Sequence, residues 1–199
     1  MWTAQFLSFL YYVLRKLRLH RILHFHSSKH QFTDYFRGFE KNPAIRKIFG
    51  ERTEETLAEL EVEYTWFRSY MWISDEDGHL IVSADYLSNG DLIDIYLDII
   101  HELVHIRQYK EGKDLFDSSN SYVNRSTEVE AYSYAIEEAR KLGLSDERIL
   151  KHLKTEWINE DDLKILAEKL GVKYSKAITQ QKTEYSKIKP PIRRIKQVS

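Results

Sequence analysis

The chain contains no cysteine among its 199 residues. This absence excludes disulfide bonds, cysteine nucleophiles and thiolate metal ligands, so any zinc ion must be bound by histidine and carboxylate. The sequence also lacks a strong charge of one sign, because 30 lysines and arginines nearly balance 31 aspartates and glutamates. The net charge of the whole chain therefore says nothing about a partner. The lack of cysteine fits a cytoplasmic protein, and this is the location that we expect.

The N-terminal part has no apolar run long enough to span a bilayer. Apolar and aromatic residues are concentrated in Trp2–Leu14, whereas a transmembrane helix needs about 20 residues. Basic residues follow this run at positions 15–18, although a signal peptide has them before its apolar part and a cleavage site after it. We therefore expect an amphipathic helix over about residues 3–25 that packs on the rest of the protein. Contact of this helix with a membrane surface is the alternative.

Hydrophobic periodicity predicts a small sheet followed by helices. Apolar and charged side chains alternate within residues 57–73, which is the period of a strand. Residues 75–78 (Asp-Glu-Asp-Gly) are typical of a hairpin turn, and the returning strand is expected at 79–85. Asp91 is suited to cap a helix that runs to about residue 111. Further helices are expected at residues 30–40, 42–50, 126–142, 145–156 and 159–170.

The helix after Asp91 contains the sequence His101-Glu102-Leu103-Val104-His105, which is an H-E-x-x-H motif. Residues four apart lie on one face of a helix. The two imidazoles can therefore bind one metal ion, and the glutamate between them can act as a general base. The alternative is a surface helix on which these three residues are ordinary polar side chains. A stripe of apolar residues with helical period argues against it: Leu92, Ile93, Tyr96, Ile99, Ile100, Leu103 and Ile106.

A catalytic zinc ion usually takes a third protein ligand, and the helix expected at 126–142 offers two carboxylates. Glu128 shares a helical face with Ala131, Ala135 and Ala139, whose small side chains would let two helices approach closely. Glu130 lies on a solvated face and matches a T-x-x-E capping box that begins at Thr127. Glu128 is therefore the favoured ligand and Glu130 the alternative. Both could also be ordinary acids of a first helical turn, favoured by the helix dipole.

These motifs resemble the gluzincins, zinc metallopeptidases with H-E-x-x-H on one helix and a glutamate ligand on a following helix. Several gluzincin branches show E-x-x-A with another small residue one turn later, which reads here as Glu128, Ala131 and Ala135. The resemblance implies that Glu102 is the general base. It also implies that one Zn²⁺ ion is bound by His101, His105 and Glu128.

The resemblance covers about residues 57–142 and implies a zincin-like α+β fold. A small antiparallel sheet would pack on the active-site helix, the ligand-bearing helix would follow, and helices would be added at both ends. The strand at 79–85 corresponds to the family's edge strand, which pairs with extended peptide substrate. We expect an N-terminal helical segment at 1–50, the zincin-like domain at 51–172 and a basic, flexible tail at 173–199.

The chain departs from the family at Tyr132. Gluzincins often have an aspartate four residues after the glutamate ligand, where it orients a zinc-bound histidine. Because a tyrosine stands there, Asp98 or the backbone would have to orient the imidazoles. Gluzincins also use a histidine or tyrosine to stabilise the oxyanion of the tetrahedral intermediate. His152 and Tyr132 are the candidates for this role, with Tyr122 and Tyr134 also close in sequence to the third ligand.

Two other metal arrangements are disfavoured. Some zinc peptidases have a third histidine six residues after the second, with a glycine midway. Those positions are Glu111 and Gln108, and an unbroken helix would carry Glu111 away from the metal. A second histidine cluster lies among arginines and lysines, which indicates a basic surface rather than a cation site: His20, His24, His26 and His30.

The expected function is hydrolysis of peptide bonds in a peptide or protein substrate. A water bound to zinc would attack the carbonyl carbon, and Glu102 would take its proton and pass it to the leaving amine. One alternative is a catalytically silent binding protein with a zincin fold. Another is a nucleic-acid-associated protease that contacts phosphates through the tail at 173–199, which has eight basic residues and one glutamate.

Overall fold

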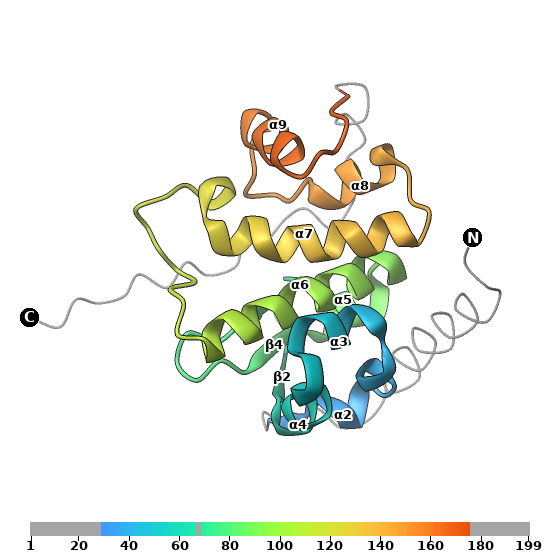
Figure 1. Cartoon of the computed structure of the whole chain (residues 1–199), viewed down its shortest axis with the longest axis vertical. Coiled ribbons are helices and arrows are strands. Elements are labelled where there is room, and N and C mark those ends of the chain that lie inside the picture. The colour runs from blue at the N-terminus through green and yellow to red at the C-terminus, as the bar shows by residue number, and fades with distance from the viewer. Residues whose placement is uncertain (1–28, 67–68, 176–199) are drawn as a thin grey trace, which may run out of the picture.

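The computed structural model describes residues 29–66 and 69–175, and within these ranges the protein is mixed α+β, as expected (Figure 1). The elements are β1 (His30–Gln31), α2 (Phe32–Tyr35), η2 (Phe39–Lys41), α3 (Pro43–Phe49), η3 (Gly50–Arg52), α4 (Thr53–Glu59), β2 (Glu61–Thr65), β3 (Met71–Ile73), β4 (Leu80–Ser83), α5 (Ala84–Asn89), α6 (Leu92–Lys110), η4 (Tyr122–Asn124), α7 (Ser126–Lys141), α8 (Asp146–Leu153) and α9 (Glu160–Lys169).

Several sequence expectations fall outside these ranges. They are the helix at residues 3–25, the histidines His20, His24 and His26, and all but the first residues of the tail at 173–199. Among the helices that the structure describes, none is long and apolar enough to cross a membrane.

The sheet has four strands in the order β1-β2-β4-β3. It is mixed, because β2 and β4 run parallel while the two outer pairs are antiparallel. The expectation of an antiparallel sheet is therefore wrong, and so is the expectation that the strand at 79–85 forms an edge. After β2 the chain forms the outer strand β3 first, and the β3–β4 hairpin then places β4 between β2 and β3. A hairpin signal in the sequence does not say which of its two strands lies outside.

The strand pattern itself is confirmed for β2 and for the hairpin. In β2, Val62 and Tyr64 are buried while their neighbours are partly exposed, as a period of two requires. The hairpin turn closes where the Gly78 amide donates to the Ser74 carbonyl oxygen at 3.1 Å. Gly78 has φ = 76°, and a Cβ there would lie 2.4 Å from the Tyr109 ring. A glycine therefore allows the hairpin to dock on the end of α6.

Two short helices are missing from the sequence prediction. Residues 57–59 belong to α4 rather than to the first strand, and residues 84–89 form α5 rather than the end of a strand and a loop. The start of α5 has a local cause, because the Ser83 hydroxyl accepts a hydrogen bond from the Tyr86 amide at 3.3 Å. The alternation within 57–60 is too short to distinguish a strand from a helical turn.

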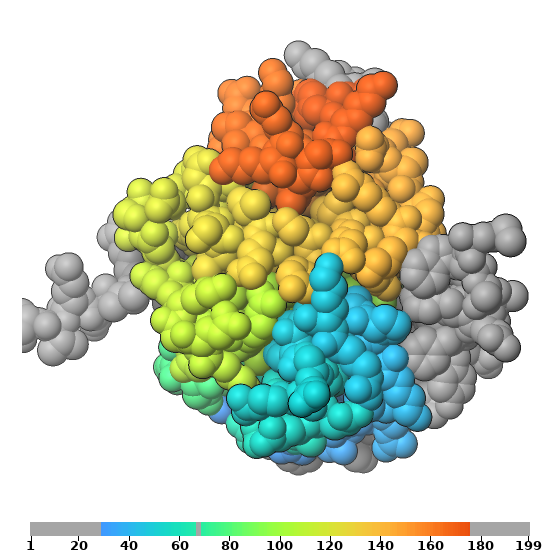
Figure 2. All heavy atoms as spheres, viewed as in Figure 1, coloured from blue at the N-terminus to red at the C-terminus, as the bar shows by residue number. Residues whose placement is uncertain are grey.

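Helix α6 is the centre of the molecule. Asp91 caps it as expected, accepting hydrogen bonds from the amides of Ile93 at 2.9 Å and Asp94 at 3.2 Å. The helix packs against α3 on one side, β3 on another and α7 along its length. A helix covered on so many sides is buried nearly all round. Figure 2 shows α7 as a yellow band between the blue-green N-terminal helices and the orange-red C-terminal helices.

One hydrophobic core joins the segments that the sequence separates. Phe32, Phe36, Phe39 and Ile45 belong to the same buried cluster as the strands, α6 and the C-terminal helices. Three helix starts occur where expected, because Asn42, Ser145 and Asn159 each accept a backbone hydrogen bond at the start of α3, α8 and α9. The single helix expected at residues 30–40 is wrong, since this segment forms β1, α2 and η2.

A buried polar network links α3, α6 and α7. The Tyr96 hydroxyl donates to Glu138 Oε1 at 2.9 Å and accepts from Asn42 Nδ2 at 2.6 Å. Glu138 is only 2% exposed, so its carboxylate depends on protein donors in place of water. The network therefore fixes the relative position of the two long helices where the N-terminal part of α6 meets the C-terminal part of α7.

Replacing Tyr96 with phenylalanine should lower the free energy of unfolding by about 1–2 kcal/mol, because Glu138 and Asn42 lose a buried partner. The measurement is urea denaturation followed by circular dichroism. Tyr109→Phe is the matched control, since its hydroxyl makes only a surface hydrogen bond to the Glu76 carbonyl oxygen. Equal losses in the two variants would contradict a stabilising role for the buried network.

Candidate metal centre

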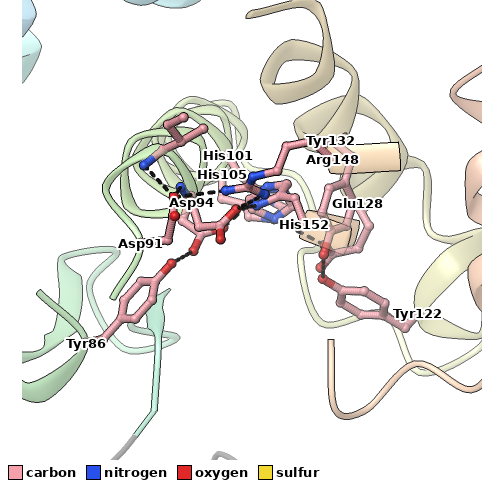
Figure 3. Close-up of polar contacts among 12 residues, drawn as sticks. Tyr86, Asp91, Asp94, His101, His105, Tyr122, Glu128, Tyr132, Arg148 and His152 are labelled. Atoms are coloured by element: carbon pink, nitrogen blue, oxygen red, sulfur yellow. Dashed lines mark hydrogen bonds and ion pairs between the residues drawn. The ribbon is translucent and has the colours of Figure 1, made fainter. Parts of the chain in front are cut away.

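The H-E-x-x-H motif lies in the middle of α6 and faces the interior. His101, Glu102 and His105 are 6%, 9% and 6% exposed. The two histidines project toward the N-terminal half of α7, where both contact Glu128 (Figure 3). The expectation of a buried helix with one polar face is confirmed, and the alternative of an ordinary surface helix is wrong.

Helix α7 places Glu128 opposite the two histidines. Ala131, Ala135 and Ala139 follow it on the same face, and each of the three is fully buried. The distance between two packed helices depends on the side chains at their contact, so these alanines let α7 lie close to α6. Glu128 is in the first turn of α7 and is 7% exposed.

Three side-chain atoms from the two helices converge. Glu128 Oε2 lies 3.4 Å from Nε2 of His101 and 3.4 Å from Nε2 of His105, and the two Nε2 atoms are 2.9 Å apart. Nitrogen and oxygen ligands at about 2.0–2.1 Å from a tetrahedral zinc ion are separated from one another by about 3.3 Å. The observed separations are close to this value, so His101, His105 and Glu128 form a buried group that could hold a metal ion.

The hydrogen bonding of the group also fits a cation. Glu128 Oε2 is buried but has no hydrogen-bond partner among the described residues. An unpaired buried carboxylate oxygen is costly, and a metal ion between the three atoms would remove that cost. The donor set is two imidazole nitrogens and one carboxylate oxygen, a combination that zinc binds in catalytic sites.

The pKa values of the three ligands reflect burial and their mutual contacts. Burial lowers the pKa of His101 to about 4. Burial also acts to lower the pKa of His105, but its 3.4 Å contact with the Glu128 carboxylate and the charge of Glu128 raise it to about 9. Burial acts to raise the pKa of Glu128, yet the close contacts of the two imidazoles hold it well below its usual range. Glu128 is therefore an anion and His101 a neutral imidazole, which are the forms that bind metal.

Glu102 differs from Glu128 in its surroundings. Burial raises the pKa of Glu102 to about 8, and the negative charges of Glu128 and Asp98 add to this. A cation held by the neighbouring ligands would favour the ionised form again. Glu102 is thus a carboxylate that can take up and release a proton near neutral pH, which suits a general base.

The residues around His105 differ from the sequence expectation. Gln108 Oε1 accepts a hydrogen bond from Nδ1 of His105 at 2.7 Å. The Gln108 amide nitrogen donates to the Thr127 carbonyl oxygen at 3.0 Å and to Glu130 Oε2 at 2.7 Å. Neither Asp98 nor the backbone orients His105, and the expectation that one of them does is wrong for this ligand. The sequence could have indicated this role, because Gln108 lies three residues after His105 and therefore on the same face of the helix.

Glu130 is not a ligand in this arrangement, and it does not form a capping box. Helix α7 begins at Ser126 without a side-chain cap, so Thr127 is already inside the helix. Glu130 instead contacts Gln108, Arg107 and Lys113. Glu111, the other disfavoured ligand position, lies at the exposed end of α6.

Asp98 belongs to a second polar group beside the first. It accepts a hydrogen bond from the Tyr86 hydroxyl, and its Oδ1 lies 3.6 Å from Nε2 of His152. The other ring nitrogen of His152, Nδ1, is 2.9 Å from Asp94 Oδ1. Burial raises the pKa of Asp98 to about 6. Although burial opposes it, the contacts with Asp94 and Asp98 raise the pKa of His152.

His152 is therefore brought to the metal group from α8, across a large sequence separation. Its side chain is 3% exposed, and its Nε2 has no hydrogen-bond partner among the described residues. It is near enough to His101 for its charge to contribute to the low pKa there, after burial and the other contacts.

Tyr132, the other candidate, packs its ring against His101 with 4.3 Å between the ring centroids. Its hydroxyl lies 3.0 Å from that of Tyr122. Burial raises the pKa of both tyrosines above the usual range, and the nearby Glu128 carboxylate adds to this. Both therefore remain neutral hydrogen-bond donors at physiological pH. Tyr134 lies elsewhere, where its hydroxyl accepts from Arg107.

An unpredicted set of aromatic rings borders the site. Successive ring centroids from Tyr132 to Tyr122, Trp157, Tyr70 and Tyr86 are 6.4, 6.3, 5.8 and 5.0 Å apart. These rings come from α7, η4, the α8–α9 connection, the segment before β3 and α5. Trp157, with 38% of its surface exposed, is an exposed large hydrophobic residue. The spacing of these residues in the sequence did not predict the set, because its members come from five different segments between residues 70 and 157.

Comparison of the chain with protein-family models, with curated proteins and with solved structures finds no match.

The metal group makes a direct prediction about metal content. The wild-type chain should bind one zinc ion, and Glu128→Ala should bind much less because a ligand is lost. Glu102→Gln and Glu130→Ala should each still bind one ion at saturating zinc, since neither side chain is among the three converging ones. The measurement is metal analysis by mass spectrometry after dialysis. Loss of zinc in Glu130→Ala but not in Glu128→Ala would contradict the assignment.

The contacts of Asp94 predict a dependence of stability on acid pH. Burial acts to raise the pKa of Asp94, but hydrogen bonds with His152 and Arg148 lower it from 3.8 to about 2. A lowered pKa in the folded state contributes stability above the unfolded value, and the contribution is lost as pH falls through the folded value. The contribution at neutral pH is about 2 kcal/mol.

Asp94→Asn should therefore be less stable than wild type at pH 7, and the difference should shrink as the pH is lowered from about 4 toward 2. Urea denaturation at several pH values measures this. Asp161→Asn, at an exposed position of α9, is the control and should follow the wild type. A constant difference at all pH values would mean that the ionised carboxylate is not the stabilising form.

Proposed function

We propose that this protein is a zinc-dependent metallopeptidase of gluzincin-like type with a zincin-like fold. The observation that carries the proposal is the convergence of both H-E-x-x-H histidines with a glutamate from the next long helix. Glu128 Oε2 faces both histidines, is buried, and makes no hydrogen bond among the described residues. Polar residues placed on a helix by chance would not be expected to face such a carboxylate. The neighbouring Glu102 supports a catalytic rather than a purely structural site.

Zinc is the proposed ion because three protein ligands of this type leave one coordination position open. A zinc ion there supplies Lewis acidity, which polarises a carbonyl oxygen and lowers the pKa of a coordinated water. His101, His105 and Glu128 would hold the ion. No thiolate competes for it, since the chain has no cysteine.

Glu102 would handle the proton. Its carboxylate follows His101 directly in α6 and is 9% exposed, so little solvent surrounds it. As general base it would take a proton from the attacking water onto a carboxylate oxygen. The same oxygen would then give the proton to the nitrogen of the leaving amine. Its raised pKa favours both halves of this transfer near neutral pH.

His152 is the residue that we favour for stabilising the oxyanion of the tetrahedral intermediate. Asp94 lies 2.9 Å from Nδ1 of this imidazole, and the contacts with Asp94 and Asp98 raise the pKa of His152, which favours the protonated form in which Nε2 can donate. Tyr132 is the second candidate, but its hydroxyl already pairs with Tyr122. Nε2 of His152 makes no hydrogen bond among the described residues, with Asp98 Oδ1 as its nearest acidic contact at 3.6 Å, so it is the better placed of the two to bind a developing charge.

A peptide or protein is the proposed substrate. Strand β3 is the edge of the sheet next to α6 and pairs with β4 on one side. An extended peptide could add to its other side through main-chain hydrogen bonds. The edge role that the sequence suggested for residues 79–85 would then belong to Met71–Ile73.

The test is cleavage of a library of proteome-derived peptides by the zinc-loaded protein, read by mass spectrometry. Glu102→Gln should keep its zinc and lose cleavage by about 10²–10⁴-fold, because proton transfer is removed while the ligands stay. Glu147→Gln, at an exposed position of α8, is the control and should cleave like wild type. Zinc binding without any cleavage by the wild type would instead favour a silent binding protein.

A further inference from the structure

We propose that Gln108 is a positioning residue that fixes the imidazole of His105 for metal binding and couples it to Glu128. The proposal rests on the metal site of the proposed function. It assigns Gln108 and its partner Glu130 the task of orienting a ligand, although neither residue contacts the metal.

The first step is the orientation of the Gln108 side chain. Its amide nitrogen points at two groups that can only accept, the Thr127 carbonyl oxygen at 3.0 Å and Glu130 Oε2 at 2.7 Å. A primary amide nitrogen has two hydrogens and no acceptor capacity. Both hydrogens are therefore used, and a flipped amide would set an oxygen against two oxygens. The side chain is 0% exposed, so water does not compete for these bonds.

The second step follows for His105. Because the amide is fixed, Oε1 of Gln108 faces Nδ1 of His105 at 2.7 Å. An oxygen that can only accept requires a hydrogen on Nδ1. When metal binding displaces the other proton, the lone pair of the imidazole is therefore on Nε2, the atom that lies 3.4 Å from Glu128 Oε2. Gln108 thus selects the tautomer and the ring orientation that metal binding needs.

The third step connects the two ligand-bearing helices. Gln108 is on α6, and the carbonyl oxygen that it binds belongs to Thr127, the residue before Glu128 on α7. A displacement of the start of α7 would therefore disturb His105 and Glu128 together. His101 has no comparable anchor: its Nδ1 lacks a hydrogen-bond partner among the described residues, and its ring packs on Tyr132.

Glu130 is held in place by two cations. Arg107 and Lys113 both contact its carboxylate, Lys113 at 3.1 Å. The same two cations contact Glu111, at 3.5 and 3.2 Å, but no hydrogen bond joins Glu111 to Gln108 in the part of the chain that the structure describes. Glu111 is therefore a matched control for Glu130, with the same charge and the same ion-pair partners.

The experiment compares zinc affinity in the full-length chain by competition with a chelating dye. Gln108→Leu should lower the affinity about 10–100-fold, because the imidazole loses its orienting acceptor. Glu130→Ala should lower it about tenfold, the low end of that range, because Thr127 still holds the amide. Glu111→Ala should leave it unchanged. Thermal unfolding without metal separates these effects from a general loss of structure.

Exchanging the residue types at positions 108 and 130 keeps the net charge and tests whether the lost zinc affinity can be recovered. Gln108→Glu alone would set two carboxylates against each other and should weaken zinc binding. Adding Glu130→Gln gives the carboxylate at 108 a donor at 130, while that carboxylate can still accept from Nδ1 of His105. The double variant should therefore recover part of the affinity that the single one loses, but not all of it, because the carboxylate at 108 still faces the Thr127 carbonyl oxygen.

Nitrogen-15 NMR of the imidazoles gives a readout that a merely structural role would not move. In the zinc-loaded wild type, the Nδ1 proton of His105 should be slow to exchange with solvent, and in Gln108→Leu this protection should be lost. Equal zinc affinity and equal proton protection in wild type and Gln108→Leu would overturn the positioning role alone. A wild type that binds no zinc would overturn the proposed function and this role together.

Discussion

A polar stripe on a helix that is otherwise enclosed by apolar packing is the constraint on which this structure depends. Helix α6 packs against the sheet, α3 and α7, so His101, Glu102, His105 and Gln108 cannot obtain hydrogen bonds from bulk water. Buried polar groups need partners from the protein or from a bound ligand. Helix α7 supplies these partners, namely the Thr127 carbonyl oxygen and the carboxylates of Glu128 and Glu130.

The partners divide into two kinds. Gln108 is fully satisfied by protein atoms, and it fixes one side of His105. The converging atoms of His101, His105 and Glu128 have mainly each other, and one carboxylate oxygen lacks a hydrogen bond. A cation between them would complete the set, whereas the protein hydrogen bonds of the described residues do not. A ligand site requires this combination, in which the supporting residue Gln108 has all its hydrogen bonds within the protein while the three converging side chains still lack a partner.

Much of the site could be predicted from the sequence because its parts are local. Four-residue spacing places two histidines on one helical face wherever that helix lies. The alanines after Glu128 distinguished it from Glu130, and the structure places Glu128 next to both histidines. The capping-box reading of Glu130 failed because it assumed that α7 begins at Thr127. The sheet prediction failed because neither strand order nor the parallel pairing of β2 with β4 is encoded in a hairpin signal.

By itself, the sequence determined the longer helices, most of their caps, the absence of thiolate ligands and the identity of the two motif histidines. The tertiary structure decided which carboxylate meets them, that Gln108 rather than Asp98 orients His105, and that His152 arrives from α8. The physical reason is distance along the chain. Helical faces and caps depend on residues within a few positions of one another, whereas these contacts depend on how separate helices share one core.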